Sequence, residues 1–151
     1  MKIKRAKFIN FVGFDNGLNK SEVEIKFNDD DKRIVMIAGG NGKGKSTLLY
    51  NLHPGAGSND PKRKTLTLEG KDARKEIDIQ DGDKFYEIVH LYPAKGNTKS
   101  FIDLIDQLGV RTKLNPNGGV GTFNDILERE LGFTNDFFKV GRIAPDNNNF
   151  N

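Results

Sequence analysis

Apolar and polar residues alternate along several short stretches of the chain, and this pattern predicts β-strands with one buried face. The clearest stretch is 22–27, where valine, isoleucine and phenylalanine alternate with charged residues. Asp81-Gly82 is a typical hairpin turn between two such stretches, and Asp15-Asn16-Gly17 also predicts a turn. The predicted strands are residues 3–11, 22–27, 65–69, 75–80, 84–91 and 100–105.

One stretch breaks the alternation. Residues 33–38 are nearly all apolar, which predicts a strand buried on both faces. The chain then enters a glycine-rich segment, IAGGNGKGKST at 37–47. Leucines recur at helical spacing after it, so a helix is predicted over 45–52, stopped by Pro54 and Gly55.

A second helix is predicted after a loop at 114–121. Thr122 is expected to cap this helix, with Asp125 completing a weak capping box, and Gly132 is expected to end it. Its predicted apolar face consists of Phe123, Ile126, Leu127 and Leu131. Residues 137–143 are apolar but too short to assign to a helix or a strand.

Composition narrows the possible classes of protein. The 151 residues suit one domain, and 24 basic against 21 acidic residues are too balanced to indicate nucleic-acid binding by themselves. The absence of cysteine excludes a disulfide framework and a thiolate metal site. No apolar run approaches the ~20 residues that a membrane span needs. We therefore expect a soluble cytoplasmic protein with no membrane partner.

The glycine-rich segment matches the pattern Gly-x4-Gly-Lys-Ser/Thr. Backbone N–H groups in such a loop can point inward around a phosphate at the start of a helix, and glycine allows positive φ and close approach. The competing interpretation is a glycine-rich turn that happens to carry lysines. The predicted phosphate-binding residues are Gly39, Asn41, Gly42, Lys43, Gly44, Lys45, Ser46 and Thr47.

Three of these residues have individual predicted roles. Lys45 is the candidate catalytic residue, because its charge would meet the β- and γ-phosphates of a nucleotide. Ser46 is the expected Mg²⁺ ligand, and Thr47 is expected to touch the α-phosphate. The predicted cofactors are therefore ATP and Mg²⁺, although a pocket that reads phosphate does not distinguish ATP from GTP.

The form GGNGKGKST, with Asn10-Phe11 ending the first strand and the alternating strand at 22–27, resembles the N-terminal ATPase lobe of SbcC-like and SMC-type DNA-repair ATPases. Within this family the chain looks most like the phage recombination endonuclease large-subunit branch, whose members also tend to lack a glutamine after the segment at 137–143. The resemblance implies an α/β P-loop NTPase fold of the ABC/SMC head type, with a mixed central sheet, an antiparallel β meander and few helices. It implies that residues 1–151 form a single N-terminal lobe, a fragment lacking the coiled coil and the C-terminal lobe.

The same resemblance implies a DNA-repair or recombination ATPase that gates a nuclease through ATP-driven head dimerisation. Its implied partners are a second ATPase head with its C-terminal lobe, forming a homodimer, a nuclease subunit and double-stranded DNA, in the host cytoplasm if the protein is phage-encoded. Candidate contacts to the DNA backbone are the N-terminal basic residues and the run at 62–64, with a solvated charged face as the alternative. The N-terminal residues are Lys2, Lys4, Arg5 and Lys7.

Several parts of a complete ATPase are missing. No apolar strand ends in Asp-Glu as a Walker B motif requires, and DLID at 103–106 is better interpreted as a strand and a turn. A signature motif and the family's glutamine after 137–143 are also missing, and His53 and His90 are expected to be structural. We therefore expect ATP hydrolysis in the complete assembly and none by the chain alone. The alternatives are a transport-type ABC nucleotide-binding domain and a truncated module that binds nucleotide without hydrolysing it.

Overall fold

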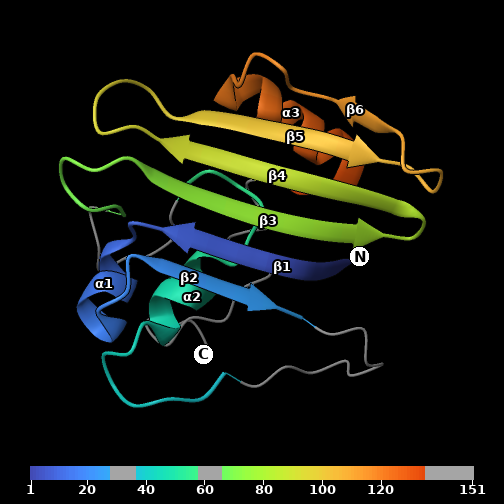
Figure 1. Ribbon diagram of the computed structural model, residues 1–151. Helices are drawn as coiled ribbons and strands as arrows, with labels where there is room; N and C mark the ends of the chain where they lie inside the picture. Colours follow the sequence, from blue (N-terminus) through green and yellow to red (C-terminus); the bar gives the residue numbers. More distant parts are fainter. Residues whose placement is uncertain (28–36, 58–65, 135–151) are drawn as a thin grey trace, which may run out of the picture.

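The computed structural model describes residues 1–27, 37–57 and 66–134. Six strands form one sheet in the order β2-β1-β3-β4-β5-β6, and every neighbouring pair is antiparallel (Figure 1). The elements in chain order are β1 (Lys2–Ile9), α1 (Val12–Leu18), β2 (Glu22–Lys26), α2 (Lys45–Asn51), β3 (Ala73–Asp81), β4 (Lys84–Tyr92), β5 (Lys99–Ile105), β6 (Arg111–Lys113) and α3 (Val120–Leu131). The fold is therefore α/β, with an antiparallel sheet and few helices.

The sheet is antiparallel throughout the described residues rather than mixed as expected. Residues 33–36 of the predicted buried strand lie outside the described part of the chain, and Ile37 and Ala38 do not belong to a strand. The P-loop NTPase topology therefore remains a prediction. Residues 28–32, 62–64 and 137–143 also lie outside the described part.

Most of the predicted strands are confirmed, because alternation follows directly from the pleat of a strand. In β2 the side chains of Val23 and Ile25 are half-buried, whereas the charged residues between them are exposed. The predicted hairpin joins β3 to β4, with Asp81 opposite Lys84 and Gly82 at a φ of +61°. The periodicity therefore located the central meander correctly.

Two predictions from local sequence signals were wrong. Residues 66–69 do not form a strand: Thr67 makes only an isolated bridge with Phe11. Asp15-Asn16-Gly17 lies inside α1 instead of forming a turn, and the helix ends at Asn19 in the left-handed conformation. The turn signal failed because this segment packs against the glycine-rich loop, a contact that its local sequence does not reveal.

The start of α3 also differs from the prediction. The helix begins at Val120 after Gly119, so Thr122 lies in its first turn and provides no cap, and no side chain caps the helix. Instead, the buried amide of Asn115 donates to the carbonyls of Gly119 and Ser100, at 2.9 and 2.6 Å, and fixes the preceding loop. The predicted end is confirmed, with Gly132 at a φ of +70°.

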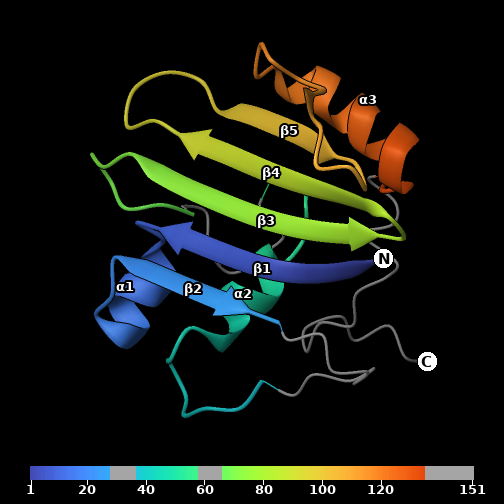
Figure 2. The same ribbon diagram turned by 45° about the vertical axis from the view of Figure 1, so that its right-hand side comes forward.

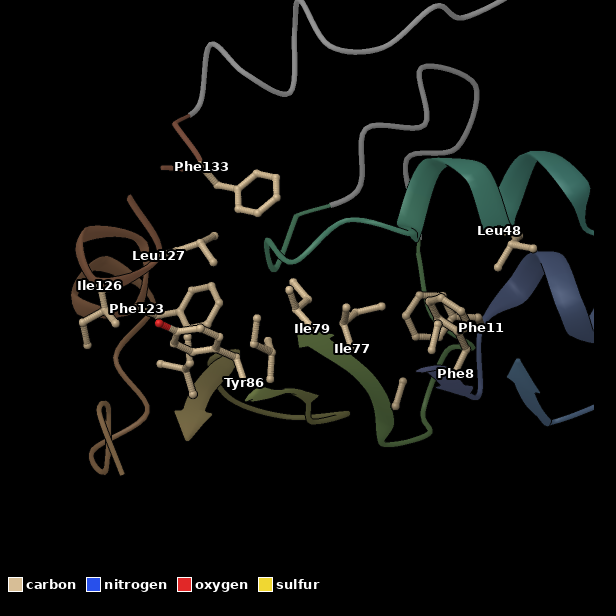
Figure 3. Packing of buried hydrophobic residues seen from close by; sticks show 14 of the residues in the cluster. Phe8, Phe11, Leu48, Ile77, Ile79, Tyr86, Phe123, Ile126, Leu127 and Phe133 are labelled. Carbon is tan, nitrogen blue, oxygen red and sulfur yellow. The ribbon is translucent and has the colours of Figure 1, made fainter. Parts of the chain in front are cut away.

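One face of the sheet carries the core. Figure 1 shows α2 and α3 behind the strands, and Figure 2 shows α3 next to β5, against which it packs. Figure 3 shows Leu48 of α2 near Phe8 and Phe11, and Phe123 of α3 beside Tyr86 at the other end of the same cluster. The buried strand residues between these ends include Ala6, Ile77, Ile79, Ile88 and Ile102. The core therefore connects the helix after the glycine-rich loop to the far end of the sheet.

Candidate functional site: a phosphate-binding loop

The loop before α2 curves around a small hollow. Gly42 and Gly44 have φ angles of +73° and +83°, in the left-handed region where residues with a side chain are strained. The hollow has a volume of about 180 Å³. It is lined by Asn41, Gly42, Lys43, Gly44, Lys45, Ser46 and Thr47. The structure thus brings together seven of the eight predicted phosphate-binding residues, and Gly39 lies just outside this lining.

Lys45 lies across the loop that precedes it. Its Nζ donates hydrogen bonds to the carbonyl oxygens of Gly39 and, at 2.6 Å, Gly40. Gly39 does not line the hollow itself and is linked to it through this hydrogen bond from Lys45. Lys43 and Ser46 are exposed. Lys43, Lys45 and Ser46 all line the hollow and therefore place two basic side chains and one hydroxyl group beside it.

Thr47 is placed differently from its neighbours in the motif. Its side chain is buried, and it lies against α1. The Asn51 side-chain amide donates to the Thr47 carbonyl at 2.7 Å, one turn along α2. The Asn51 Oδ1 atom is also buried, and it has no hydrogen-bond partner among the described residues. The predicted contact between Thr47 and an α-phosphate remains a prediction.

Sequence reasoning missed the contribution of α1 to this site. Gly13 and Gly17 are four residues apart, so they lie on one side of the helix, and both are buried. Gly17 lies against the backbone of the loop, and Gly13 lies against Thr47. The available signal was the glycine pair with the spacing of one helical turn, but the turn-like residues between them concealed it.

The chain leaving α2 is held to the sheet by three side chains. The carbonyl oxygens of Pro54, Gly55 and Ala56 accept hydrogen bonds from side chains on the core face of β3 and β4. The donors are His90 Nε2 at 2.7 Å, Lys75 Nζ at 2.8 Å and Tyr92 Oη at 2.7 Å, respectively. Both ends of α2 are therefore fixed, one by the loop and one by the sheet.

Two of these donors are buried bases. Burial lowers the pKa of Lys75 well below its usual value, and its Nζ donates to the neutral Gly55 carbonyl. Burial, with a further contribution from Lys75, lowers the pKa of His90 to about 3. Because its Nε2 donates to Pro54, the neutral His90 accepts from the Ser100 hydroxyl through Nδ1, at 2.8 Å. This placement fits the structural role expected for His90.

The N-terminal basic residues are partly neutralised by acidic neighbours. Arg5 pairs with Glu24 on β2 and with Glu76 and Asp78 on β3, and its hydrogen bond lowers the pKa of Glu24. Lys7 pairs with Glu22 at 2.8 Å. These charges are available to DNA only if the existing pairs break, so the arrangement resembles the solvated charged face more than a basic patch.

No protein-family model matches the chain, and a search of curated proteins also found no match. Among the described helices, none is long and apolar enough to cross a membrane. The described residues also contain no cluster of three or more His, Cys, Asp or Glu side chains that could hold a metal ion. Function therefore has to be inferred from the loop and from the sequence pattern.

Proposed function

We propose that the chain binds the phosphate tail of ATP, together with Mg²⁺, in the loop at residues 39–47. The observation that carries this proposal is the hollow bounded by Asn41–Thr47, with two left-handed glycines and Lys45 at its rim. Its volume of about 180 Å³ is smaller than the ~300–1,000 Å³ of a typical ligand pocket. The hollow therefore suits a polyphosphate tail rather than a whole nucleotide.

The chemistry of the loop favours an anion. Backbone N–H groups that surround a concavity bind phosphate, and glycine lets the phosphate approach the backbone closely. The Lys45 ammonium now donates to two neutral carbonyls, and a charged phosphate oxygen is a stronger acceptor. Binding is therefore expected to draw Lys45 from Gly39 and Gly40 toward the ligand.

Ser46 fits the expected role in binding Mg²⁺. Mg²⁺ keeps several water ligands and commonly binds through one or two protein groups plus substrate phosphates. The exposed Ser46 hydroxyl lines the hollow beside Lys45 and can supply one such ligand. The metal would then arrive with the nucleotide.

At the level of the whole protein, we propose the ATP-binding lobe of a DNA-repair or recombination ATPase. The proposal includes a second ATPase head with its C-terminal lobe, forming a homodimer, and a nuclease subunit acting on double-stranded DNA. Support comes from the loop sequence, Asn10-Phe11 and the alternating strand β2. Phosphoryl transfer depends on positioning and on charge stabilisation. In this proposal the loop supplies the phosphate contacts and the C-terminal lobe supplies the Walker B acid, so both are needed for hydrolysis.

A binding measurement tests the phosphate site. Calorimetry with MgATP is expected to show binding to the wild type and at least a tenfold loss in Lys45→Ala, because the variant lacks the charge that reaches the phosphates. Lys84→Ala is the matched control, since Lys84 is an exposed lysine in the β3–β4 hairpin. Equal affinity in Lys45→Ala and the wild type would show that the site is assigned wrongly.

A second experiment tests the catalytic part of the proposal. A C-terminal lobe that carries a signature motif and a Walker B acid is supplied in trans with double-stranded DNA. Restored DNA-stimulated ATP hydrolysis supports the ATPase proposal. Nucleotide binding without hydrolysis supports the non-catalytic module instead.

A further inference from the structure

Helix α1 lies very close to the proposed phosphate-binding loop at residues 39–47, which we call the phosphate loop. A Cβ atom added to Gly17 would lie 2.3 Å from the Gly42 carbonyl oxygen and 3.0 Å from the Gly44 nitrogen. A Cβ atom added to Gly13 would lie 1.7 Å from the Thr47 Oγ1 atom. Cβ atoms in proteins essentially never approach a neighbour closer than 3.0 Å. No residue other than glycine therefore fits at these two positions without displacing the loop or α2.

Phe14, the residue after Gly13 in α1, also contacts the loop. Its side chain is 3% exposed, and its ring packs against Phe8 of β1 with centroids 5.3 Å apart. A Cβ atom added to Gly44 would lie 2.9 Å from Phe14 Cδ1. The loop thus rests on a ring that is itself anchored in the core.

We propose that contact with α1 holds the phosphate loop in its binding conformation, and that Gly13 and Gly17 are positioning residues for the bound phosphate. This inference rests on the proposed function of the loop. Gly42 and Gly44 can adopt many backbone conformations, and a flexible loop loses binding free energy when a ligand orders it. Contact with Phe14 and Gly17, which lie about one turn apart on α1, restricts these glycines before the ligand arrives.

Of the contacts made by Gly13 and Gly17, the contact of Gly17 gives the more specific test of the proposal. The three atoms nearest to the added Cβ are all backbone atoms, of Gly42, Lys43 and Gly44, so rotation of a side chain cannot relieve this contact. A methyl group at residue 17 must therefore move the peptide groups that line the hollow. Their N–H groups would then point away from the positions that suit an anion.

Substitution of Gly17 tests the inference. Gly17→Ala is expected to weaken binding of tripolyphosphate and of MgATP by at least tenfold, as measured by calorimetry. Gly121→Ala is the matched control: Gly121 lies in α3, a Cβ atom there meets nothing within 4 Å, and affinity is expected to be unchanged. In ¹H–¹⁵N spectra, the amide signals of Gly42 and Gly44 are expected to move in Gly17→Ala, whereas those of β4 stay in place.

A second pair of variants covers the case in which Gly17→Ala does not fold. Phe14→Leu loosens the contact with Gly44 without a clash, and Phe123→Leu removes similar volume from the core beneath α3. Phe14→Leu is expected to lower both the melting temperature and the affinity, and Phe123→Leu only the melting temperature. The inference fails if the wild type binds tripolyphosphate and a folded Gly17→Ala or Phe14→Leu variant binds it equally well. If the wild type binds neither ligand, the proposed function itself fails.

Discussion

At the scale of single residues, the buried polar groups on the core face of the sheet have the largest consequences. Lys75, His90 and Ser100 occupy adjacent positions on β3, β4 and β5, and each is fully buried. Burying polar groups costs free energy unless they are hydrogen-bonded, and these residues bond to each other or to the chain leaving α2. Lys75 and His90 therefore attach the segment after α2, at Pro54 and Gly55, to the sheet.

His90 makes stability depend on pH. Its folded pKa is about 3, whereas an unfolded histidine has a pKa of about 6.5. Between these values the unfolded chain binds a proton that the folded chain excludes, so stability falls as the pH falls, by up to about 1.4 kcal/mol per pH unit. Urea denaturation from pH 6.5 to pH 5 is expected to show this decline, and His90→Gln is expected to flatten it.

Lys75 contributes with the same sign, because burial lowers its pKa well below the usual value and the unfolded chain again binds a proton that the folded chain excludes. Burial raises the pKa of Asp78, which has the opposite effect on the slope. The comparison of His90→Gln with the wild type therefore isolates the contribution of the histidine. An unchanged slope in His90→Gln would show that another group causes the decline.

At the scale of elements, α3 shows that a helix can begin without the cap that its own sequence suggests. Asn115 lies five residues before the helix and holds the carbonyls of Ser100 and Gly119. Its side chain therefore joins the end of the loop to β5. The position of α3 on the sheet depends on this amide rather than on Thr122.

Asn115→Ala is expected to destabilise the protein by roughly 1–3 kcal/mol, because the buried Ser100 carbonyl and the part-buried Gly119 carbonyl lose a donor. Thermal and urea denaturation measure the change. Asn124→Ala, at an exposed position within α3, is the control and is expected to change stability by less than about 0.5 kcal/mol. A similar small effect in Asn115→Ala would mean that the loop is held by other contacts.

At the scale of the whole molecule, one core joins the phosphate loop to the far end of the sheet. Leu48 lies in α2 directly after the loop, and it belongs to the same buried cluster as Phe123 of α3 (Figure 3). A single core of this kind favours one cooperative unfolding transition in a small domain. The glycine-rich loop at residues 39–47 is therefore expected to unfold together with the sheet.

Leu48→Ala is expected to lower the free energy of unfolding by about 2–5 kcal/mol through loss of buried volume. Circular dichroism and tyrosine fluorescence should still report one coincident transition, because Tyr86 and Leu48 share the core. Leu49→Ala is the control on the same helix, since Leu49 is 57% exposed. Two separate transitions would show that α2 and its loop unfold independently.

The sequence by itself determined the features that follow from local periodicity and spacing. Alternation located β2 through β5, Asp81-Gly82 located their central hairpin, and the motif spacing located a loop in which Gly42 and Gly44 have positive φ. Each depends on the backbone geometry of a few neighbouring residues, which the order of the side chains reports directly.

Only the tertiary structure decided the features that depend on distant residues. Gly17 lies beside Gly42, and His90 lies beside Pro54, across 25 and 36 positions in the chain. Turn-like residues form a helix in α1 because packing against the loop outweighs their weak local preference. The contact of α1 with the loop at residues 39–47 and the hydrogen bonds between the sheet and the chain after α2 join residues far apart in the sequence. No local pattern in the sequence specifies them.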